Sequence, residues 1–298
     1  MEEPNNNSDR RNHPIGVFDS GMGGISVLRE ITAYMPREHY IYVGDSANAP
    51  YGTKTVEEVR KLTLSQISKL IDRHQAKAIV VACNTATSAA VAVLRKTYPD
   101  LPLVGVEPAV KPAALAGSHA RVLVMATPRT LQEEKFLNLE HIYEDRANIF
   151  PLPCPGLMEY VEQGILDGEE IHSFLHKLLD PYKDKGLTGI VLGCTHYPFL
   201  KKAISEVTDY QVPLYDGGEG TARELLRRVK EAGLLRGCPA GVGKEDPGSL
   251  ESSGLKGSIT FYSTCGSPDY LKRSIELYRY DNPVADQLDL IAGDPGSL

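Results

Sequence analysis

The hydrophobic pattern of the chain contains two short apolar runs with no polar alternation, and a cysteine follows each run closely. Residues 78–81 (AIVV) precede Cys83, and residues 190–192 (IVL) precede Cys194. An unbroken run of this kind, rich in β-branched residues, is typical of a strand buried on both faces of a parallel sheet. The pattern therefore predicts two parallel strands, each with a thiol at its carboxyl end.

Further strands and helices are predicted in alternation along both halves of the chain. Strands are expected at 13–18, 40–43, 101–106, 121–125 and 258–262, helices at 25–34, 89–96, 169–179 and 270–278, and loops at 46–54 and 151–156. Thr55 with Glu58, and Thr130 with Glu133, have the spacing of capping boxes that open two more helices. Alternating strands and helices indicate doubly wound parallel sheets. Because the strand and cysteine pattern occurs twice, we expect two similar α/β domains that meet face to face.

Length and composition are those of an ordinary soluble protein of about two domains. The chain has 298 residues, 42% of them hydrophobic and 24% charged, and a net charge of -7 that disfavours nucleic acid and anionic membranes as partners. Its polar N-terminus has no apolar core, and no stretch approaches ~18 apolar residues, so neither a signal peptide nor a membrane span is expected. We therefore expect a cytoplasmic protein.

Five cysteines occur at irregular spacing and without CxxC pairs, which favours reduced thiols over a disulfide framework or a zinc site. A buried free cysteine is usually an inert small hydrophobe, and nothing argues against that interpretation for Cys154, Cys238 and Cys265. For Cys83 and Cys194 it is weaker, because both precede polar residues at strand-to-helix turns. No metal ligand set is predicted.

Two thiols at strand ends suggest one site between the two domains. Ligands bind open α/β sheets at the carboxyl ends of the strands, and Cys83 is followed there by Asn84 and Thr85, Cys194 by Thr195 and His196. One thiol could remove a proton from a carbon while the other supplies one from behind. Such a pair would invert a stereocentre without a cofactor.

Catalysis by these thiols needs assistance, since a thiol of pKa ~8.5 is only a few per cent ionised at neutral pH. His196, Asp19 and Glu162 are the candidate assisting groups. Alternatively, Cys194 and His196 could form the ion pair of a cysteine hydrolase. That alternative gives Cys83 no role.

A second motif, at residues 21–24, resembles a glycine-rich dinucleotide loop. Gly21, Gly23 and Ser26 nearly fit the spacing, and Asp45 lies about where an acid that binds ribose should be. The match is short, and Asp19 would point a negative charge at a pyrophosphate. We therefore expect a tight turn here and no cofactor.

Six sequence motifs give the chain a more specific resemblance. They are GVFDSGMGGISVL (16–28), GDSANAPYGTK (44–54), VVACNTAT (80–87), GVEPAV (105–110), LGCTHYP (192–198) and DGGEGTA (216–222). In these motifs and their order the chain resembles the glutamate racemases of the aspartate/glutamate racemase superfamily.

The resemblance implies a discontinuous first α/β domain, 1–106 plus 213–298, around a second domain, 107–212. Residues 237–257 are rich in Gly, Pro and Ser, have no counterpart expected in the family, and are predicted to be a surface insertion. Cys83 and Cys194 would be the acid-base pair, assisted by Asp19, His196 and Glu162. By the same resemblance the residues that hold the amino acid would be Asp19, Ser20, Tyr51, Gly52, Asn84, Thr85, Thr127, Thr195 and His196.

The implied function is cofactor-independent interconversion of L- and D-glutamate, which would supply D-glutamate for peptidoglycan synthesis. An aspartate racemase with the same two thiols is the first alternative, and a nucleotide-dependent oxidoreductase and a non-catalytic amino-acid binding protein are the others. Glutamate is thus the expected small-molecule partner. The sequence does not determine the oligomeric state, and a homodimer is compatible with it.

Overall fold

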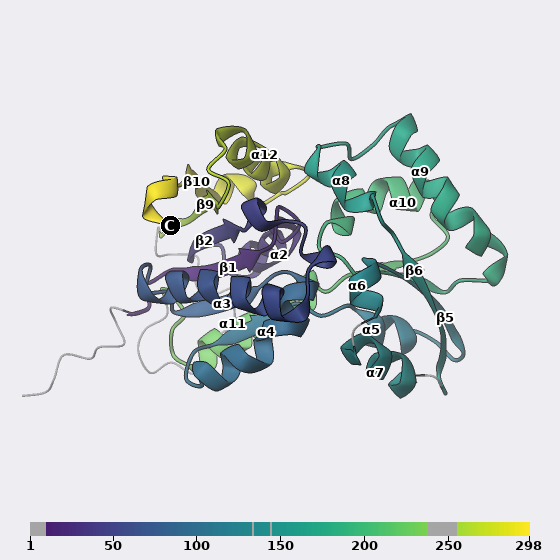
Figure 1. Cartoon of the computed structure of the whole chain (residues 1–298), viewed down its shortest axis with the longest axis horizontal. Coiled ribbons are helices and arrows are strands. Elements are labelled where there is room, and N and C mark those ends of the chain that lie inside the picture. The colour runs from purple at the N-terminus through teal and green to yellow at the C-terminus, as the bar shows by residue number, and fades with distance from the viewer. Residues whose placement is uncertain (1–9, 133, 144, 238–254) are drawn as a thin grey trace, which may run out of the picture.

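A computed structural model arranges the chain as two α/β units side by side (Figure 1) and describes residues 10–132, 134–143, 145–237 and 255–298. Each unit has its own sheet, and every pair of neighbouring strands is parallel. The predicted α/β class is confirmed. Most of the expected insertion, with Cys238, lies outside the described residues.

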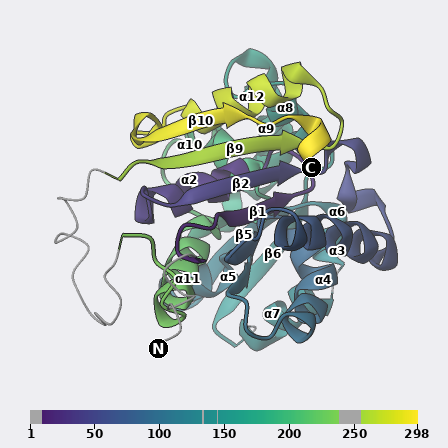
Figure 2. The same ribbon diagram turned by 90° about the vertical axis from the view of Figure 1, so that its left-hand side faces the viewer.

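The first sheet has six strands in the order β10-β9-β2-β1-β3-β4, and Figure 2 shows β10, β9, β2 and β1 one above the other. Their bounds are β1 Ile15–Asp19, β2 His39–Gly44, β3 Ala78–Val81, β4 Leu103–Gly105, β9 Gly257–Ser263 and β10 Leu288–Ala292. In the register, Ile15 lies beside Tyr40 on one side and Ala78 on the other. The sheet thus joins strands from both ends of the chain.

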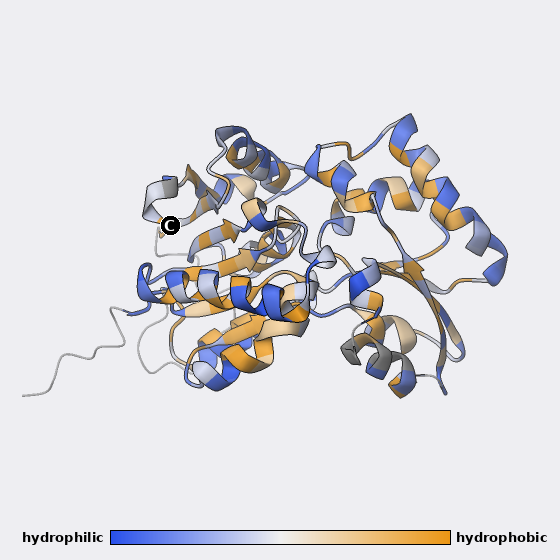
Figure 3. Cartoon of the chain, viewed as in Figure 1, coloured by the Kyte–Doolittle hydropathy of each residue, from blue (hydrophilic) through white to orange (hydrophobic). Residues whose placement is uncertain are grey.

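Helices cover both faces of this sheet. On one face lie α2 (Ile25–Tyr34), α11 (Gly218–Glu231) and α12 (Pro268–Arg279), and on the other lie α3 (Val56–Asp72) and α4 (Asn84–Thr97). Ile15 and Val17 of β1 pack in the core with α2, whereas Phe18 packs in the core beneath α3 and α4. Because alternate residues point to opposite faces, a strand covered on both sides carries apolar residues on both of its faces, and Figure 3 shows orange segments along the strands of this sheet.

The second sheet has the order β6-β5-β7-β8. Its strands are β5 Ala120–Ala126, β6 Ala147–Pro153, β7 Gly189–Leu192 and β8 Leu214–Tyr215. One face packs against α5 (Val110–Ala114) and α7 (Glu134–Tyr143), the other against α8 (Leu157–Glu162), α9 (Glu169–Leu179) and α10 (Lys201–Val207). The short helix α6 (Pro128–Leu131) follows β5 at the side facing the first unit.

Short 3₁₀ helices complete the described chain. They are η1 Ser46–Asn48, η2 Tyr51–Thr53, η3 Asp180–Lys185, η4 Tyr197–Leu200, η6 Ala285–Gln287 and η7 Pro295–Ser297. No helix in the described ranges combines the length and the apolarity that crossing a membrane requires.

One hydrophobic cluster spans both units. It includes Val17 and Leu28 of the first unit together with Leu192 and Leu200 of the second. A polar contact crosses the same boundary, because the Ser26 hydroxyl donates a hydrogen bond of 2.7 Å to the Thr195 carbonyl. The units therefore pack directly on one another.

Several element boundaries differ from the predictions. Helix α4 begins at Asn84 and not at 89, and the loop predicted at 46–54 contains η1 and η2. Residues predicted as loop at 151–156 begin within β6, and β10 was not predicted. The prolines of β6 are tolerated because it is an edge strand, where one side needs no ladder hydrogen bond.

The cap of the helix after β5 is also different. Thr127, not Thr130, is the N-cap, and its hydroxyl accepts a hydrogen bond of 3.3 Å from the Thr130 N–H. Glu133, the expected partner of Thr130, lies outside the described residues. The predicted capping box of Thr55 and Glu58 is confirmed.

The division into domains 1–106 plus 213–298 and 107–212 stays a prediction. Strand β8 pairs with β7 in the second sheet. A return to the first unit after Tyr215 suits this pairing better than one at 213.

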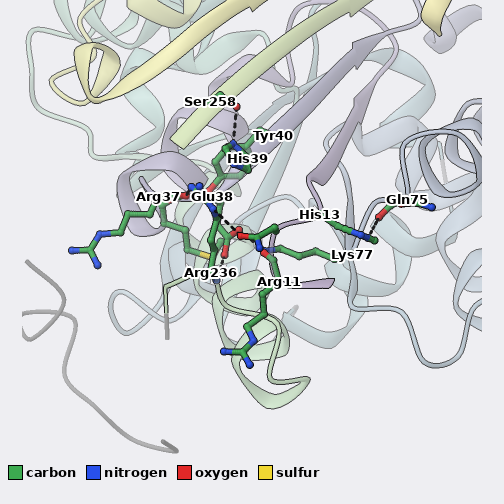
Figure 4. Close-up of polar contacts among 12 residues, drawn as sticks. Arg11, His13, Arg37, Glu38, His39, Tyr40, Gln75, Lys77, Arg236 and Ser258 are labelled. Atoms are coloured by element: carbon green, nitrogen blue, oxygen red, sulfur yellow. Dashed lines mark hydrogen bonds and ion pairs between the residues drawn. The ribbon is translucent and has the colours of Figure 1, made fainter. Parts of the chain in front are cut away.

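A buried ion pair lies at the amino-terminal ends of the strands of the first sheet (Figure 4). The Lys77 ammonium is 2.5 Å from a Glu38 carboxylate oxygen, and both side chains are almost inaccessible to solvent. The Arg236 N–H donates to the other Glu38 oxygen at 2.8 Å, and the Arg236 guanidinium donates to the carbonyl of Lys256 at 3.0 Å. The cluster therefore fastens together the two chain segments that flank 238–254.

Candidate active site

A small pocket lies between the two units and is lined by both of them. Its walls are formed by Ser20, Tyr51, Gly52, Cys83, Asn84 and Thr85 of the first unit and by Thr127, Thr130, Met158, Gly193, Cys194, Thr195 and His196 of the second. The cavity is about 30 Å³, room for one or two water molecules. An amino acid can enter only if lining side chains or whole units move apart.

Cys83 occupies the turn between β3 and α4, as the N-cap residue of the helix. Its sulfur is 3.4 Å from the Ser20 hydroxyl oxygen. Burial and, to a smaller extent, the Asp19 carboxylate raise the pKa of the Cys83 thiol to about 12, although the Ser20 hydroxyl and a backbone N–H of α4 partly stabilise the thiolate. Cys83 is therefore a protonated thiol at neutral pH.

Cys194 follows β7 and begins a chain of polar side chains. Its sulfur is 3.6 Å from Nδ1 of His196, and Nε2 of His196 is 2.7 Å from a carboxylate oxygen of Glu162 on α8. Burial lowers the pKa of His196, but the contacts with Cys194 and Glu162 outweigh burial and hold this pKa well above its usual value. His196 therefore links the Cys194 sulfur to the Glu162 carboxylate across the pocket wall.

Glu162 is held in place from the first unit. Burial would raise its pKa, but the hydrogen bond and charge of His196 outweigh this, and the pKa lies below its ordinary value. The Met22 N–H adds a hydrogen bond of 3.1 Å to the same carboxylate oxygen that contacts His196. Glu162 therefore remains a carboxylate that can pair with a charged imidazole.

The glycines after β1 make room for this arrangement. A Cβ at Gly21 would lie 2.6 Å from a Glu162 carboxylate oxygen, and a Cβ at Gly23 would lie 2.7 Å from the Thr195 hydroxyl and closer still to the His196 ring. The turn predicted at 21–24 thus has a definite role, because only residues without a side chain let the second unit approach so closely.

Asp19 lies behind the pocket wall and is fully buried at the end of β1. One of its carboxylate oxygens accepts a hydrogen bond of 3.0 Å from the Gly21 N–H. Burial raises the pKa of Asp19, and the charge of His196 and the N–H groups of the following turn offset this only in part. Its negative charge faces Cys83 from the first unit, as Glu162 faces His196 from the second.

Tyr51 is positioned by a buried network around Asp45. The tyrosine hydroxyl donates to one carboxylate oxygen of Asp45 at 2.6 Å, and the hydroxyl of Thr264 donates to the other at 2.7 Å. The Asn48 amide donates to both oxygens. The acid considered for ribose binding is therefore engaged in fixing the loop at 46–53.

The structure places every predicted binding residue except Asp19 in the wall of the pocket, and Asp19 and Glu162 directly behind it. Cys154 is buried beside the pocket without lining it, and Cys265 is exposed. The sequence reasoning missed Thr130, Met158 and Gly193. Thr130 stands three residues after the predicted Thr127, as expected for an adjacent position on a helical turn, whereas Met158 carried no signal.

Comparison with known proteins points to one family. The family model described as Asp/Glu/Hydantoin racemase matches residues 15–225. A glutamate racemase of Clostridium botulinum (strain Alaska E43 / Type E3) is 46% identical over 269 residues, which cover 90% of this chain and 98% of the relative.

Two solved structures have the same architecture. The glutamate racemase of Francisella tularensis, in complex with D-glutamate, has a TM-score of 0.73 and 26% identity, covering 97% of this chain and 100% of the other. The Escherichia coli glutamate racemase, in complex with L-glutamate and the activator UDP-MurNAc-ala, has a TM-score of 0.72 and 27% identity, covering 94% and 98%. The chain belongs to the Asp/Glu/Hydantoin racemase family and is an isomerase.

Proposed function

We propose that this enzyme interconverts L- and D-glutamate without a cofactor, with Cys83 and Cys194 acting on opposite faces of the α-carbon. The observation that carries the proposal is that the two thiols come from different units and line one pocket. A racemase needs an acid on one side of a carbon and a base on the other. The glutamate complexes of the structural relatives support the choice of substrate.

The environments of the two thiols support an unequal resting state. The raised pKa of Cys83, about 12, keeps its proton on the sulfur, so we assign the role of base to Cys194, whose sulfur contacts His196. In this state Cys194 would take the α-proton of L-glutamate, leaving a carbanion. The Cys83 thiol would then give its proton to the opposite face, producing D-glutamate and exchanging the two protonation states.

Substrate recognition would rest on short neutral side chains. Ser20, Thr85 and Thr195 offer hydroxyl groups, and the Asn84 side-chain oxygen is buried without a hydrogen-bond partner among the described residues. Such an oxygen can accept a hydrogen bond from the α-ammonium group of an amino acid. A carboxylate of the substrate would be favoured near the free N–H groups at the start of α4.

The test is chiral analysis of glutamate with Cys83→Ser and Cys194→Ser, each checked for folding by circular dichroism. A general acid or base contributes about 10²- to 10⁴-fold, and serine is a far weaker acid than cysteine. Both variants should therefore lose almost all racemisation in both directions. Cys265→Ser, which makes the same change at an exposed thiol outside the pocket, is the matched control and should keep parental activity.

Isotope exchange tests the division of labour between the thiols. In D2O the parent should place deuterium at the α-carbon of the product enantiomer. Loss of Cys194 should leave only the D-enantiomer able to exchange its α-proton, and loss of Cys83 only the L-enantiomer. A folded single variant that racemises within a few-fold of the parent would disprove the two-thiol mechanism.

The same chiral assay separates glutamate from aspartate as substrate. We expect a much higher kcat/KM for glutamate, and equal or reversed values would transfer the assignment to aspartate racemase. We further propose that the enzyme works in the cytoplasm and supplies D-glutamate for peptidoglycan synthesis. Expression of this protein in a D-glutamate auxotroph tests that role, because it should restore growth without added D-glutamate. If the expressed enzyme is active and growth is not restored, the role is refuted.

A further inference from the structure

We propose that Asp167, His172 and Glu206 form a binding site for a divalent transition-metal ion, with Zn²⁺ as the expected occupant. Asp167 lies in the connection between α8 and α9, His172 in the first turns of α9, and Glu206 near the end of α10. The two helices pack side by side in the second unit (Figure 1). None of the three residues lines the pocket between the units, so the site is separate from the proposed racemase chemistry.

The distances among the three side chains fit one ion. One ligand atom from each residue lies within 4.8 Å of the others, and Nε2 of His172 is 3.1 Å from Oδ1 of Asp167 and 3.2 Å from Oε2 of Glu206. Zinc takes nitrogen and carboxylate oxygen ligands at ~2.0 to 2.2 Å, which puts neighbouring ligand atoms roughly 3 Å apart. The observed separations are of this size.

The unsatisfied imidazole nitrogen is a second indication. Nε2 of His172 is shielded from solvent, yet it makes no hydrogen bond of acceptable geometry with either nearby carboxylate. A ring nitrogen that served only as a hydrogen-bond donor would be expected to point at one oxygen. The His172 nitrogen lies about equally far from two carboxylate oxygens without a hydrogen bond to either, which leaves it available as a metal ligand.

The other oxygen of each carboxylate has its own partner. The Lys202 ammonium is 2.5 Å from Oδ2 of Asp167 and 3.8 Å from Oε1 of Glu206. The Tyr210 hydroxyl donates to that same Glu206 oxygen at 3.3 Å. The Gly168 N–H donates to Oδ1 of Asp167, the oxygen nearest His172, at 2.7 Å. Such outer contacts orient metal ligands. The positive charge of Lys202, however, opposes a cation bound nearby.

The ligand set selects among ions. An imidazole suits zinc and neighbouring transition metals, whereas Mg²⁺ and Ca²⁺ prefer oxygen alone. The side chains are 29 to 42% exposed, which leaves room for water to complete the coordination. A bound ion would tie α10 to α9 and to the segment after Glu162, stiffening the unit that carries His196.

The test is calorimetric titration of the full chain with Zn²⁺, together with thermal unfolding. We expect one ion per chain and a higher Tm with Zn²⁺, and no effect of Mg²⁺ at the same concentration. His172→Asn should weaken binding by at least the ~10- to 100-fold that loss of an outer contact costs in metal sites. His176→Asn is the matched control, because this histidine lies on the same helix and pairs with Asp180 alone among the described acids.

Lys202→Gln gives the sharpest discrimination. If the cluster is an ion-pair network without a metal, removing Lys202 brings no gain in affinity for Zn²⁺. If it is a metal site, the variant should bind Zn²⁺ severalfold more tightly, since a competing charge has gone. Titration with Co²⁺ identifies the ligands, because a thiolate produces an intense charge-transfer band that imidazole and carboxylate do not.

Three results would overturn the proposal: no zinc binding by the parent, binding that survives His172→Asn, or a Co²⁺ spectrum with thiolate character. Racemisation by metal-free His172→Asn should match the parent, so failure of the metal site leaves the proposed function untouched.

Discussion

Replacing Glu162 by Gln tests whether a carboxylate must support His196. The amide has nearly the same shape and can still accept a hydrogen bond from Nε2 of His196 and from the Met22 N–H, so the change removes charge and little else. A hydrogen bond to a charged partner contributes about 1.5 to 3 kcal/mol. If all of it acts in the transition state, kcat/KM should fall about 10- to 150-fold.

The pH profile should change in a defined direction. Burial favours neutral His196, and Glu162 is one of the groups that hold its pKa above the ordinary value. The imidazolium is present below this pKa and is lost as pH rises through it. Without the carboxylate the pKa falls, so the high-pH limb of kcat/KM for the Cys194 step should move to lower pH.

The assay is chiral analysis of initial rates from both enantiomers across pH. Because L- and D-glutamate have equal free energies in an achiral solution, kcat/KM must fall by the same factor in both directions, while kcat and KM can change separately. Glu159→Gln, an exposed position on the same helix, is the control. A Glu162→Gln enzyme within twofold of the parent, with an unmoved high-pH limb, would show that the carboxylate has no such role.

Two other substitutions test the packing of the chain. Gly23→Ala places a methyl group against the His196 ring, so kcat/KM should fall at least tenfold. The control Gly220→Ala has open space around the new methyl group and should not change kcat/KM. Equal activities of the two variants would contradict the packing argument. Lys77→Met leaves Glu38 buried without its partner and should cost about 3 to 5 kcal/mol in urea unfolding. Adding Glu38→Leu should recover part of that loss, and a single variant as stable as the parent would refute the estimate.

Much of the architecture could be predicted because local patterns and packing agree. The apolar runs before Cys83 and Cys194 are strands, and α9 has the predicted bounds, since its apolar positions repeat at helical spacing. β6 and β10 escaped prediction for another reason. Both are edge strands with exposed residues, so neither shows the continuous apolar run of a central strand.

The residues of the site that follow strand ends could be predicted from the sequence. The contacts between distant segments of the chain could not. Parallel strands bring Cys83 and Ser20 to one edge of the first sheet. No local sequence pattern predicts that the Met22 N–H donates a hydrogen bond to the carboxylate of Glu162, which lies 140 residues later in the chain. Glu162 was one of three candidate assisting groups in the sequence, and the contacts that support its role come from the packing of the two units.

The contact between Arg236 and Lys256, which flank the segment 238–254, affects how the length of this part of the chain can change in evolution. The guanidinium of Arg236 donates a hydrogen bond to the carbonyl of Lys256. The residues on either side of the segment 238–254 therefore lie next to each other. Closing a loop between fixed neighbouring ends costs only ~0.6 kcal/mol more for each doubling of its length. Insertions and deletions can therefore accumulate at the amino-terminal edge of the first sheet without displacing Cys83 at the opposite edge of that sheet.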